Sequence, residues 1–227
     1  VYHRQSKTNF DHEANTLIYE PSANIRLTAA FSRSNYIYQI PGPLTDSMFH
    51  ANPRHATRSR NYFNPEIYIP SLQLDWKLSE RTFVTWNISA VLGNRNSVQF
   101  DKPATVPDAI DPVTLQYAGR QVDIDNFNSY TSELRLLHHY KLSKVAGTIA
   151  TGVQIMNNDL HRRQLGKGTS GSDFDLSIDE TGWGRDLHFK TKNVALFIEN
   201  AFHLLPRFSV SPGARIEIGQ SVMTGLI

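Results

Sequence analysis

The sequence predicts an all-β fold, in which about eight antiparallel strands form a segment of a transmembrane β-barrel. Three observations support this prediction. Apolar side chains recur at every second position in several segments, short and long connections alternate along the chain, and no run of about 18 apolar residues could form a membrane-spanning helix. Because the interior of such a barrel is polar, a hydrophobic fraction of 40% does not exclude a membrane protein.

The alternation is clearest in residues 82–92. Val84, Trp86 and Ile88 are separated there by small polar side chains. Side chains on a strand alternate between its two faces, so one face of this strand is apolar and the other polar. The same stripe recurs in three further segments, at residues 68–76, 194–198 and 208–218.

Turn-forming residues divide the chain into strands. Pro21 and Asn24 mark the first turn, and Pro41 with Gly42 ends the strand that begins at Ile25. The strands are expected at about residues 15–19, 25–40, 65–78, 82–98, 127–140, 145–157, 189–203 and 208–218.

Short turns and long loops alternate between these strands. The turns are expected at residues 20–24, 79–81, 141–144 and 204–207, and the long polar loops at residues 41–64, 99–126 and 158–188. Outer-membrane barrels place short turns on the periplasmic side and long loops outside, whereas the strands of a β-sandwich usually have shorter and less regular connections. The order of connections therefore favours the barrel.

Composition excludes several functional classes. The chain has no cysteine, so it forms neither a disulfide nor a thiolate metal site. A net charge of +2 is too small to indicate a nucleic-acid partner. The chain begins at Val1 without a charged and then apolar leader, and it ends soon after a predicted strand without closing a barrel. We therefore expect an internal piece of a longer protein.

Several sequence motifs resemble those of a known family. Residues 44–63 contain a Leu-Thr-Asp start, an Asn-Pro-Arg triplet and an Arg-Ser-Arg-Asn-Tyr-Phe end. This run resembles a loop of TonB-dependent outer-membrane receptors of the ferric dicitrate type, and residues 93–98 resemble the end of the next strand in that group. Residues 193–200 and 212–217 resemble segments that are common across the wider receptor family. The resemblance covers roughly residues 40–218.

The resemblance implies a role in the uptake of a scarce ligand across the bacterial outer membrane. Receptors of this family have a 22-stranded barrel that is plugged by an N-terminal domain, and they import their ligand with energy relayed by TonB. Residues 1–227 would be part of the barrel domain, without the plug domain and the remaining strands. The implied partners are a ferric chelate (a siderophore or ferric citrate), the protein's own plug domain, the TonB complex and outer-membrane lipid.

The first long loop is the best candidate for ligand capture. It holds Arg54, His55, Arg58 and Arg60, and its three arginines against one aspartate give it a charge of +2. Ferric chelates are negatively charged and rich in oxygen, and arginine presents several fixed N–H donors to such groups. Alternatively, these arginines form ion pairs within the loops or contact lipopolysaccharide phosphates.

A second basic patch is expected at the start of the third long loop, where His161, Arg162 and Arg163 follow one another. These residues are further candidates for ligand contact. That loop is acidic as a whole, so neutralisation by Asp159 or Asp173 is the alternative.

Charged residues within the strands are expected to face the lumen, because on the lipid face they would cost about 2–4 kcal/mol near the middle of the bilayer. They either contact the plug and line the transport path, or form a cross-strand ladder of ion pairs that stiffens the wall. The residues concerned are Glu133, Arg135, Glu199, Arg215 and Glu217.

Motif look-alikes give no enzyme or metal site. Residues 166–171 match a nucleotide-binding glycine pattern but lack the strand and helix that it requires. Residues 173–179 have the spacing of a calcium loop, but Ile178 stands where a glycine is required, which leaves only a weak Ca²⁺ site as an alternative. His50 and His55 share a loop without a supporting carboxylate or cysteine pattern. The sequence thus predicts no catalytic residue, no metal ligand and no intrinsic cofactor.

Two alternative functions stay open. A receptor of the same kind could take haem or an oligosaccharide, although the loops contain few aromatic residues and no recognisable haem motif. A soluble β-sandwich that binds protein or carbohydrate would instead bury the apolar stripes in its core.

Overall fold

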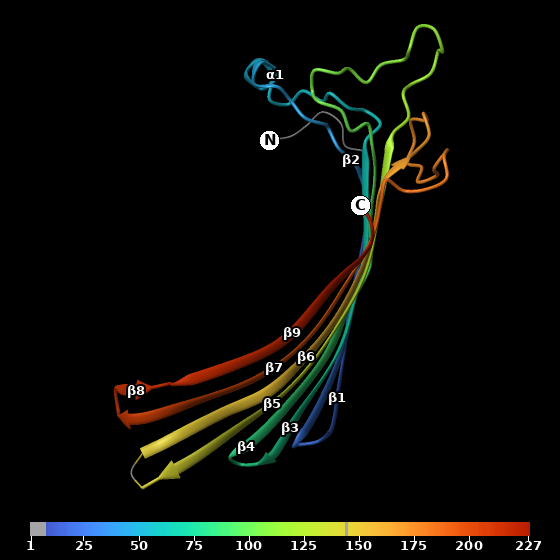
Figure 1. Cartoon of the computed structure of the whole chain (residues 1–227). Helices are drawn as coiled ribbons and strands as arrows, with labels where there is room; N and C mark the ends of the chain where they lie inside the picture. Colours follow the sequence, from blue (N-terminus) through green and yellow to red (C-terminus); the bar gives the residue numbers. More distant parts are fainter. Residues whose placement is uncertain (1–7, 144) are drawn as a thin grey trace.

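The protein forms one strongly curved antiparallel sheet (Figure 1). The computed structural model describes residues 8–143 and 145–227. The elements are β1 (Thr8–Ser22), β2 (Ile25–Gln39), α1 (Asp46–Ala51), β3 (Tyr62–Ser79), β4 (Thr82–Gln99), β5 (Gln121–Leu142), β6 (Val145–Lys167), β7 (Arg185–Leu205), β8 (Phe208–Val210) and β9 (Gly213–Leu226). Each strand from β1 to β8 pairs with its neighbour in sequence, and β9 also pairs with β7. Within the described ranges there is no second sheet, so the apolar stripes are not the core of a sandwich.

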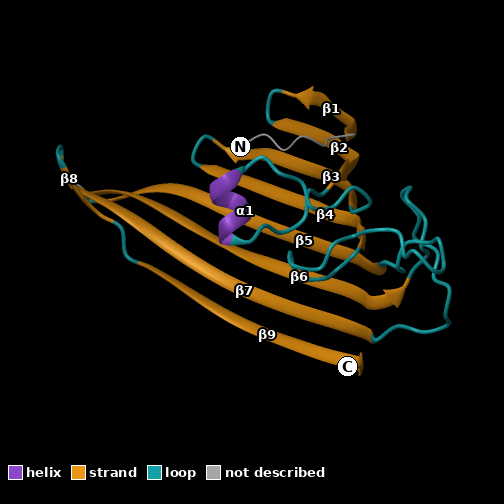
Figure 2. Ribbon diagram, turned by 90° about the horizontal axis from the view of Figure 1, so that it is seen from above, coloured by secondary structure: helices purple, strands orange, loops and turns teal. Residues whose placement is uncertain are grey.

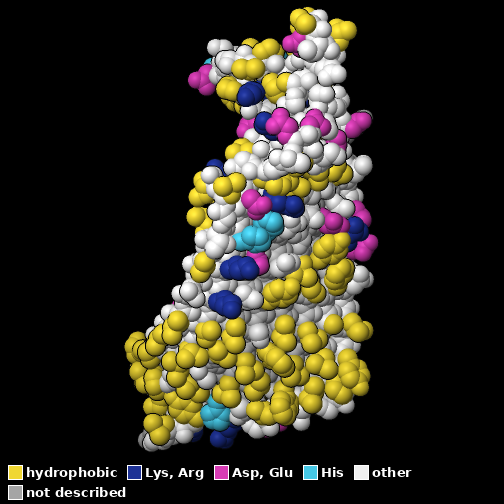
Figure 3. All heavy atoms as spheres, turned by 45° about the vertical axis from the view of Figure 1, so that its right-hand side comes forward, with side chains coloured by type: hydrophobic (Ala, Val, Ile, Leu, Met, Phe, Trp, Pro, Cys, Tyr) yellow, Lys and Arg dark blue, Asp and Glu magenta, His cyan; other side chains and the backbone are white. Residues whose placement is uncertain are grey.

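The strand registers join the apolar stripes into one belt. Leu74 pairs with Trp86, and Trp86 pairs with Leu134. The row continues through β6 to Leu196 and Ile216. Its large side chains are mostly exposed, and Figure 3 shows a broad hydrophobic area over this part of the sheet. We call this side of the sheet the outward face and the concave side the inner face.

Short turns lie at one end of the sheet and long loops at the other, as predicted (Figure 1). The long loops cover residues 40–61, 100–120 and 168–184. The third loop is shorter than expected because β6 and β7 stay paired as far as Gln164 and Arg185.

Pro212 divides the last predicted strand in two. The proline has no N–H group to donate to the ladder, and β8 ends at Val210 while β9 begins at Gly213. Both pieces pair with β7, so they occupy one strand position in the arc.

The first long loop contains a helix that the sequence analysis did not predict. The Thr45 hydroxyl caps α1 by accepting the backbone N–H of Met48 at 3.2 Å. The helix lies over the concave side of the sheet (Figures 1 and 2). None of the described residues forms a helix that is long and apolar enough to cross a membrane.

A small buried core lies beneath the long loops. Tyr62, Val98 and Val122 are buried on β3, β4 and β5, and Phe174 and Trp183 of the third loop pack against them. The rings of Tyr62 and Phe174 meet edge to face at 6.1 Å between centres. Burial of these apolar side chains fixes the third loop on the sheet.

Candidate functional site

Arg60 joins the three long loops. Its side chain is 1% exposed, and its ion-pair partner Asp108 from the second loop is 2% exposed. Arg60 donates to the Asp108 carboxylate at 2.6 and 3.0 Å, and its guanidinium lies 4.2 Å from the centre of the Tyr117 ring. Its other N–H groups donate to the carbonyl oxygens of Ala118, Ser170 and Gly171. All five N–H donors of Arg60 are therefore used within the protein.

Arg58 and Arg120 complete this arginine junction. Both are 1% exposed, and Arg120 donates to the backbone oxygen of Arg60 at 2.8 Å. Burial, together with the nearby charge of Arg60, lowers the pKa of Arg120 below its ordinary value. Arg58 donates to the carbonyl oxygens of Phe100, Lys102 and Pro103.

The predicted loop patch is thus divided between two environments. Arg58 and Arg60 hold the loops together and do not reach the solvent. Arg54 and His55 are exposed, and the backbone N–H of Arg54 donates to the side chain of Asn52 at 3.0 Å. Of the four predicted residues, only Arg54 and His55 are open to solvent.

The second predicted patch lies on a strand, so the expectation that it begins the third loop is wrong. His161, Arg162 and Arg163 belong to β6, which continues to Lys167. Neighbouring strand residues point to opposite faces, so Arg162 faces inward while His161 and Arg163 face outward. Apart from Leu160, residues 158–164 are polar on both faces, so no apolar alternation predicted that the strand continues.

Charged and aromatic side chains gather on the inner face below the long loops. Asp125 accepts two hydrogen bonds from Arg162, at 2.9 and 3.0 Å, and one from Arg95 at 2.5 Å. The strand register brings these three residues together, because Arg95 pairs with Asp125 and Asp125 pairs with Arg162. Two guanidinium groups surround this carboxylate, and the charge of Asp123 also acts on Arg162.

An aromatic row lies on the same face. Ring centres are 5.7 Å apart for Phe10 and Tyr36, 5.8 Å for Tyr36 and Tyr38, and 5.5 Å for Tyr38 and Phe63. Tyr36 and Phe63 line a cavity of about 470 Å³ together with Arg95. We call the aromatic row and the charged cluster around Asp125 the inner vestibule.

No sequence pattern predicted the inner vestibule. Its members come from β1 to β6 and meet only through strand pairing. The spacing of Tyr36 and Tyr38 by two residues was the one local sign that aromatic rings share a face.

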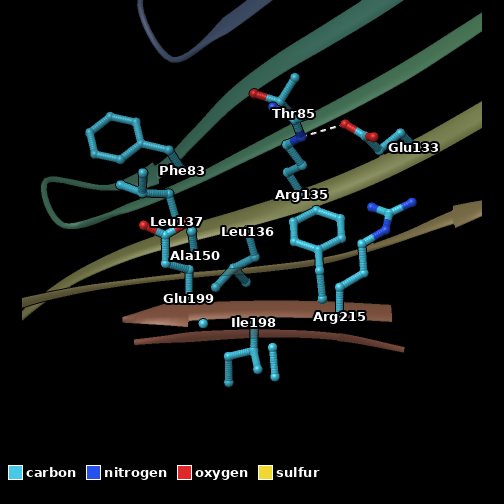
Figure 4. A pocket seen from close by; sticks show the side chains of 13 residues that line it. Phe83, Thr85, Glu133, Arg135, Leu136, Leu137, Ala150, Ile198, Glu199 and Arg215 are labelled. Atoms are coloured by element: carbon cyan, nitrogen blue, oxygen red, sulfur yellow. Dashed lines mark ion pairs between the residues drawn. The ribbon is translucent and has the colours of Figure 1, made fainter. Parts of the chain in front are cut away.

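A second concavity lies nearer the short turns, also on the inner face. It has a volume of about 840 Å³, and Phe83 and Thr85 contribute to its wall (Figure 4). Four of the five charged strand residues line it, namely Glu133, Arg135, Glu199 and Arg215. The registers put all five, Glu217 included, on the face opposite the apolar belt.

Ion pairs in this lower cavity run along strands instead of across them. Glu133 pairs with Arg135 two residues further along β5, and Arg215 pairs with Glu217 in the same way on β9. Gln154 of β6 connects the pairs by donating to Glu133 and accepting from Arg215, each at 2.9 Å. The wall is therefore polar and linked from β5 to β9.

Residues that could hold a metal ion lie on the outward face. Within residues 8–143 and 145–227, His161, Asp186 and His188 bring three ligand atoms within 4.8 Å of one another. No sequence pattern indicated this group, because its members lie on two strands and only the pairing of β6 with β7 brings them together.

The fold can be compared with solved structures. The ferric citrate transporter FecA, in its unliganded form, matches 98% of this chain with a TM-score of 0.82 and 15% sequence identity. The siderophore receptor PiuA from Acinetobacter baumannii matches 100% with a TM-score of 0.71 and 12% identity. The open form of the ferric-catecholate import receptor Fiu from E. coli K12 matches 98% with a TM-score of 0.68 and 11% identity.

The chain folds as an arc of such a receptor's barrel. It spans 31%, 37% and 39% of the three matched chains, which is roughly a third of their length. No protein-family model matches the sequence. No curated protein matches it either. The matched structures are transport receptors and not enzymes.

Proposed function

We propose that this chain is part of the barrel wall of an outer-membrane receptor that imports a ferric chelate with energy relayed by TonB. The inner vestibule is the observation that carries this proposal, because it places two arginines and a row of aromatic rings on the concave side of a barrel arc. The fold shared with the matched receptors and the motif at residues 44–63 support it. Residues 1–227 would all belong to the barrel domain.

In this proposal, other parts of the receptor and its surroundings contact the two faces of the sheet. The plug domain would pack against the lower cavity, where charged side chains point inward. The TonB complex would act through that plug, and outer-membrane lipid would surround the apolar belt. Nucleic acid is not among the proposed partners.

The proposed ligand would meet the exposed loop residues first and the vestibule next. Arg54 and His55 lie in the first long loop, and Arg95 and Arg162 lie further in. Guanidinium groups form strong, directional hydrogen bonds to oxygen-rich anions. Asp125 holds both vestibule arginines in place before the ligand arrives, which lowers the entropy cost of binding. The process needs no covalent step.

Ferric citrate is the first ligand that we propose, because the motif resemblance is to the ferric dicitrate type. A chelate that carries aromatic rings, such as a ferric catecholate, is the second candidate. The aromatic row favours this second ligand, since each well-placed ring pair contributes about 0.5–1.5 kcal/mol beyond area burial.

Equilibrium binding to the intact receptor in detergent tests both candidates. We expect one of ferric citrate and a ferric tris-catecholate to bind, with the iron-free chelator binding more weakly. Arg162→Ala should weaken binding about 10- to 100-fold, because a charge-assisted hydrogen bond contributes about 1.5–3 kcal/mol.

Arg26→Ala is the matched control, since Arg26 is also a strand arginine but lies beside a short turn. It should leave the dissociation constant unchanged. A receptor that binds neither ferric chelate, or that binds one equally well with and without Arg162, would contradict the proposed function.

A further inference from the structure

Four titratable side chains of β6 and β7 meet on the outward face of the sheet. His161 and His188 are direct cross-strand partners. Each histidine reaches diagonally to an aspartate of the other strand: His161 Nε2 lies 2.7 Å from Asp186 Oδ1, and His188 Nδ1 lies 3.6 Å from Asp159 Oδ1. The two imidazole rings stack at 3.9 Å between centres, with 13° between their planes.

This arrangement has the composition of a transition-metal site. Imidazole nitrogen and carboxylate oxygen are ligands of Zn²⁺, and imidazole also suits Cu²⁺ and Ni²⁺. One ligand atom each from His161, Asp186 and His188 already lies within 4.8 Å of the other two. With bonds of about 2.0–2.2 Å, the ligand atoms of a tetrahedral Zn²⁺ site lie roughly 3.3 Å apart, so modest side-chain rotations would complete the site.

Asp159 provides a second observation that is independent of the ligand spacing. Its Oδ1 atom and the facing Nδ1 atom of His188 are both buried, and neither has a hydrogen-bond partner. Buried polar atoms are nearly always satisfied. A carboxylate beside the imidazole of a metal ligand commonly orients that ring, and Asp159 is placed to do this for His188.

The position of the cluster keeps it accessible to ions in water. His161 lies 16 residues beyond the start of β6, which is about 37 Å above the short turn at ~3.3 Å per residue and ~45° tilt. The apolar band of such barrels is only about 25 Å tall. Figure 3 shows histidine beside acidic and basic side chains above the hydrophobic belt. The His161, Asp186 and His188 side chains are 29%, 41% and 41% exposed.

Nearby cations limit the affinity of this position but do not exclude a metal ion. Lys190 Nζ lies 3.7 Å from Asp159 Oδ2, and Arg163 is the cross-strand partner of Asp186. Two aspartates balance these two positive charges, and the neutral imidazoles then supply the lone pairs.

We propose that His161, Asp186 and His188 bind a divalent transition-metal ion such as Zn²⁺, with Asp159 orienting His188. The site lies on the opposite face from the inner vestibule. It is therefore separate from the route of an imported chelate and does not depend on the proposed function.

Calorimetric titration of the intact, untagged protein in detergent with ZnCl₂ tests the proposal, after treatment with a chelator. We expect the double variant His161→Asn and His188→Asn to lose one equivalent of bound Zn²⁺. Asp159→Asn should weaken that equivalent about 10- to 100-fold, as is usual when the residue that orients a metal ligand is lost. His50→Asn with His55→Asn is the matched control, and it should bind as the unaltered protein does.

Electron paramagnetic resonance with Cu²⁺ gives a second measurement, in which each single histidine variant can be compared with the unaltered protein. Unaltered protein should show coupling to two imidazole nitrogens, and His161→Asn or His188→Asn should each remove one. Folding of each variant is checked by its heat-dependent shift on electrophoresis. Equal Zn²⁺ stoichiometry and affinity in the double variant and the unaltered protein would overturn the proposal, as would a Cu²⁺ spectrum that either substitution leaves unchanged.

Discussion

Arg60 and Asp108 form a buried ion pair on which the packing of the long loops depends. We predict that Arg60→Ala destabilises the loop region by about 3–5 kcal/mol, because removal of one partner leaves an uncompensated buried charge on Asp108. Hydrogen exchange should show lost protection in residues 100–120 and 168–184, which Arg60 connects. Arg54→Ala removes an exposed arginine of the same loop and should leave exchange unchanged. Similar exchange in the two variants would contradict this assignment.

Asp175 makes the third loop sensitive to acid. The backbone N–H of Ser177 donates to its carboxylate, and this bond, with help from Thr169 and the charge of Arg120, holds the pKa of Asp175 below its ordinary value. A lowered pKa means that the contribution to stability is complete above the unfolded value of ~3.9 and is lost as pH falls through the lower folded value. We therefore predict faster proteolysis of residues 168–184 below about pH 4 than at pH 7.

Asp175→Asn provides the control for this acid effect. The variant lacks the titrating group, so its loop should be cleaved at a rate that changes less between pH 7 and pH 3. If the cleavage rate of the variant depended on pH as that of the unaltered protein does, the prediction for Asp175 would be contradicted and the effect would belong to other carboxylates.

The loop arginines also show how far sequence reasoning reaches for single residues. A count of charges correctly describes the first loop as basic. It makes Arg54, Arg58 and Arg60 equal candidates for ligand contact. Burial separates them, and burial depends on partners that lie 42 to 111 positions away along the chain. No local pattern records such contacts, so the structural role of Arg58 and Arg60 required the folded loops.

Gly152 lets an aromatic side chain cross β6 on the inner face. A Cβ atom at this position would lie 2.5 Å from the Phe197 ring and 2.4 Å from the backbone oxygen of Leu134. Phe197 in turn lies beneath the guanidinium groups of Arg135 and Arg215, each 5.9 Å from the ring centre. The small residue therefore supports the packing of the lower cavity.

We predict that Gly152→Ala destabilises the protein by about 1–3 kcal/mol, because overpacking forces side-chain or backbone shifts. Urea unfolding of the intact protein in detergent, followed by tryptophan fluorescence, measures this loss. Gly219→Ala is a matched control on β9, where the nearest atom to an added Cβ is the flexible end of Asn193 at 3.1 Å. Equal urea midpoints for the two variants would contradict this prediction, because they would show that Phe197 moves aside at no cost in stability.

Strands with an apolar and a polar face were predictable, and those without one were not. The stripes of β3, β4, β7 and β9 indicated where these strands lie, because a strand with one apolar face repeats apolar side chains at every second residue. Residues 158–167 of β6 carry polar side chains on both faces, so they looked like a loop. Helix α1 spans 6 residues, which is too short for a helical periodicity to appear.

The curved sheet explains why the candidate site was harder to predict than the fold. Alternation specifies the faces of one strand, but the neighbours on each face depend on register between strands. Arg95, Asp125 and Arg162 meet because three strands align, as do His161 and His188 on the opposite side. The fold class therefore follows from the sequence pattern, while both clusters follow from the assembled arc.

The arc also predicts which side chains meet lipid in the intact barrel. Trp86 belongs to the apolar belt, and its neighbour Asn87 lies on the inner face.

The chain contains no cysteine, so single cysteines introduced at positions 86, 87 and 196 can each carry one spin label. In bilayers, labels at 86 and 196 should collide with membrane-dissolved oxygen more than with a water-soluble nickel complex, because oxygen concentrates in hydrocarbon. The label at 87 should show the opposite preference or be shielded from both reagents. Equal accessibility at 86 and 87 would contradict the assignment of the two faces, and with it the barrel wall itself.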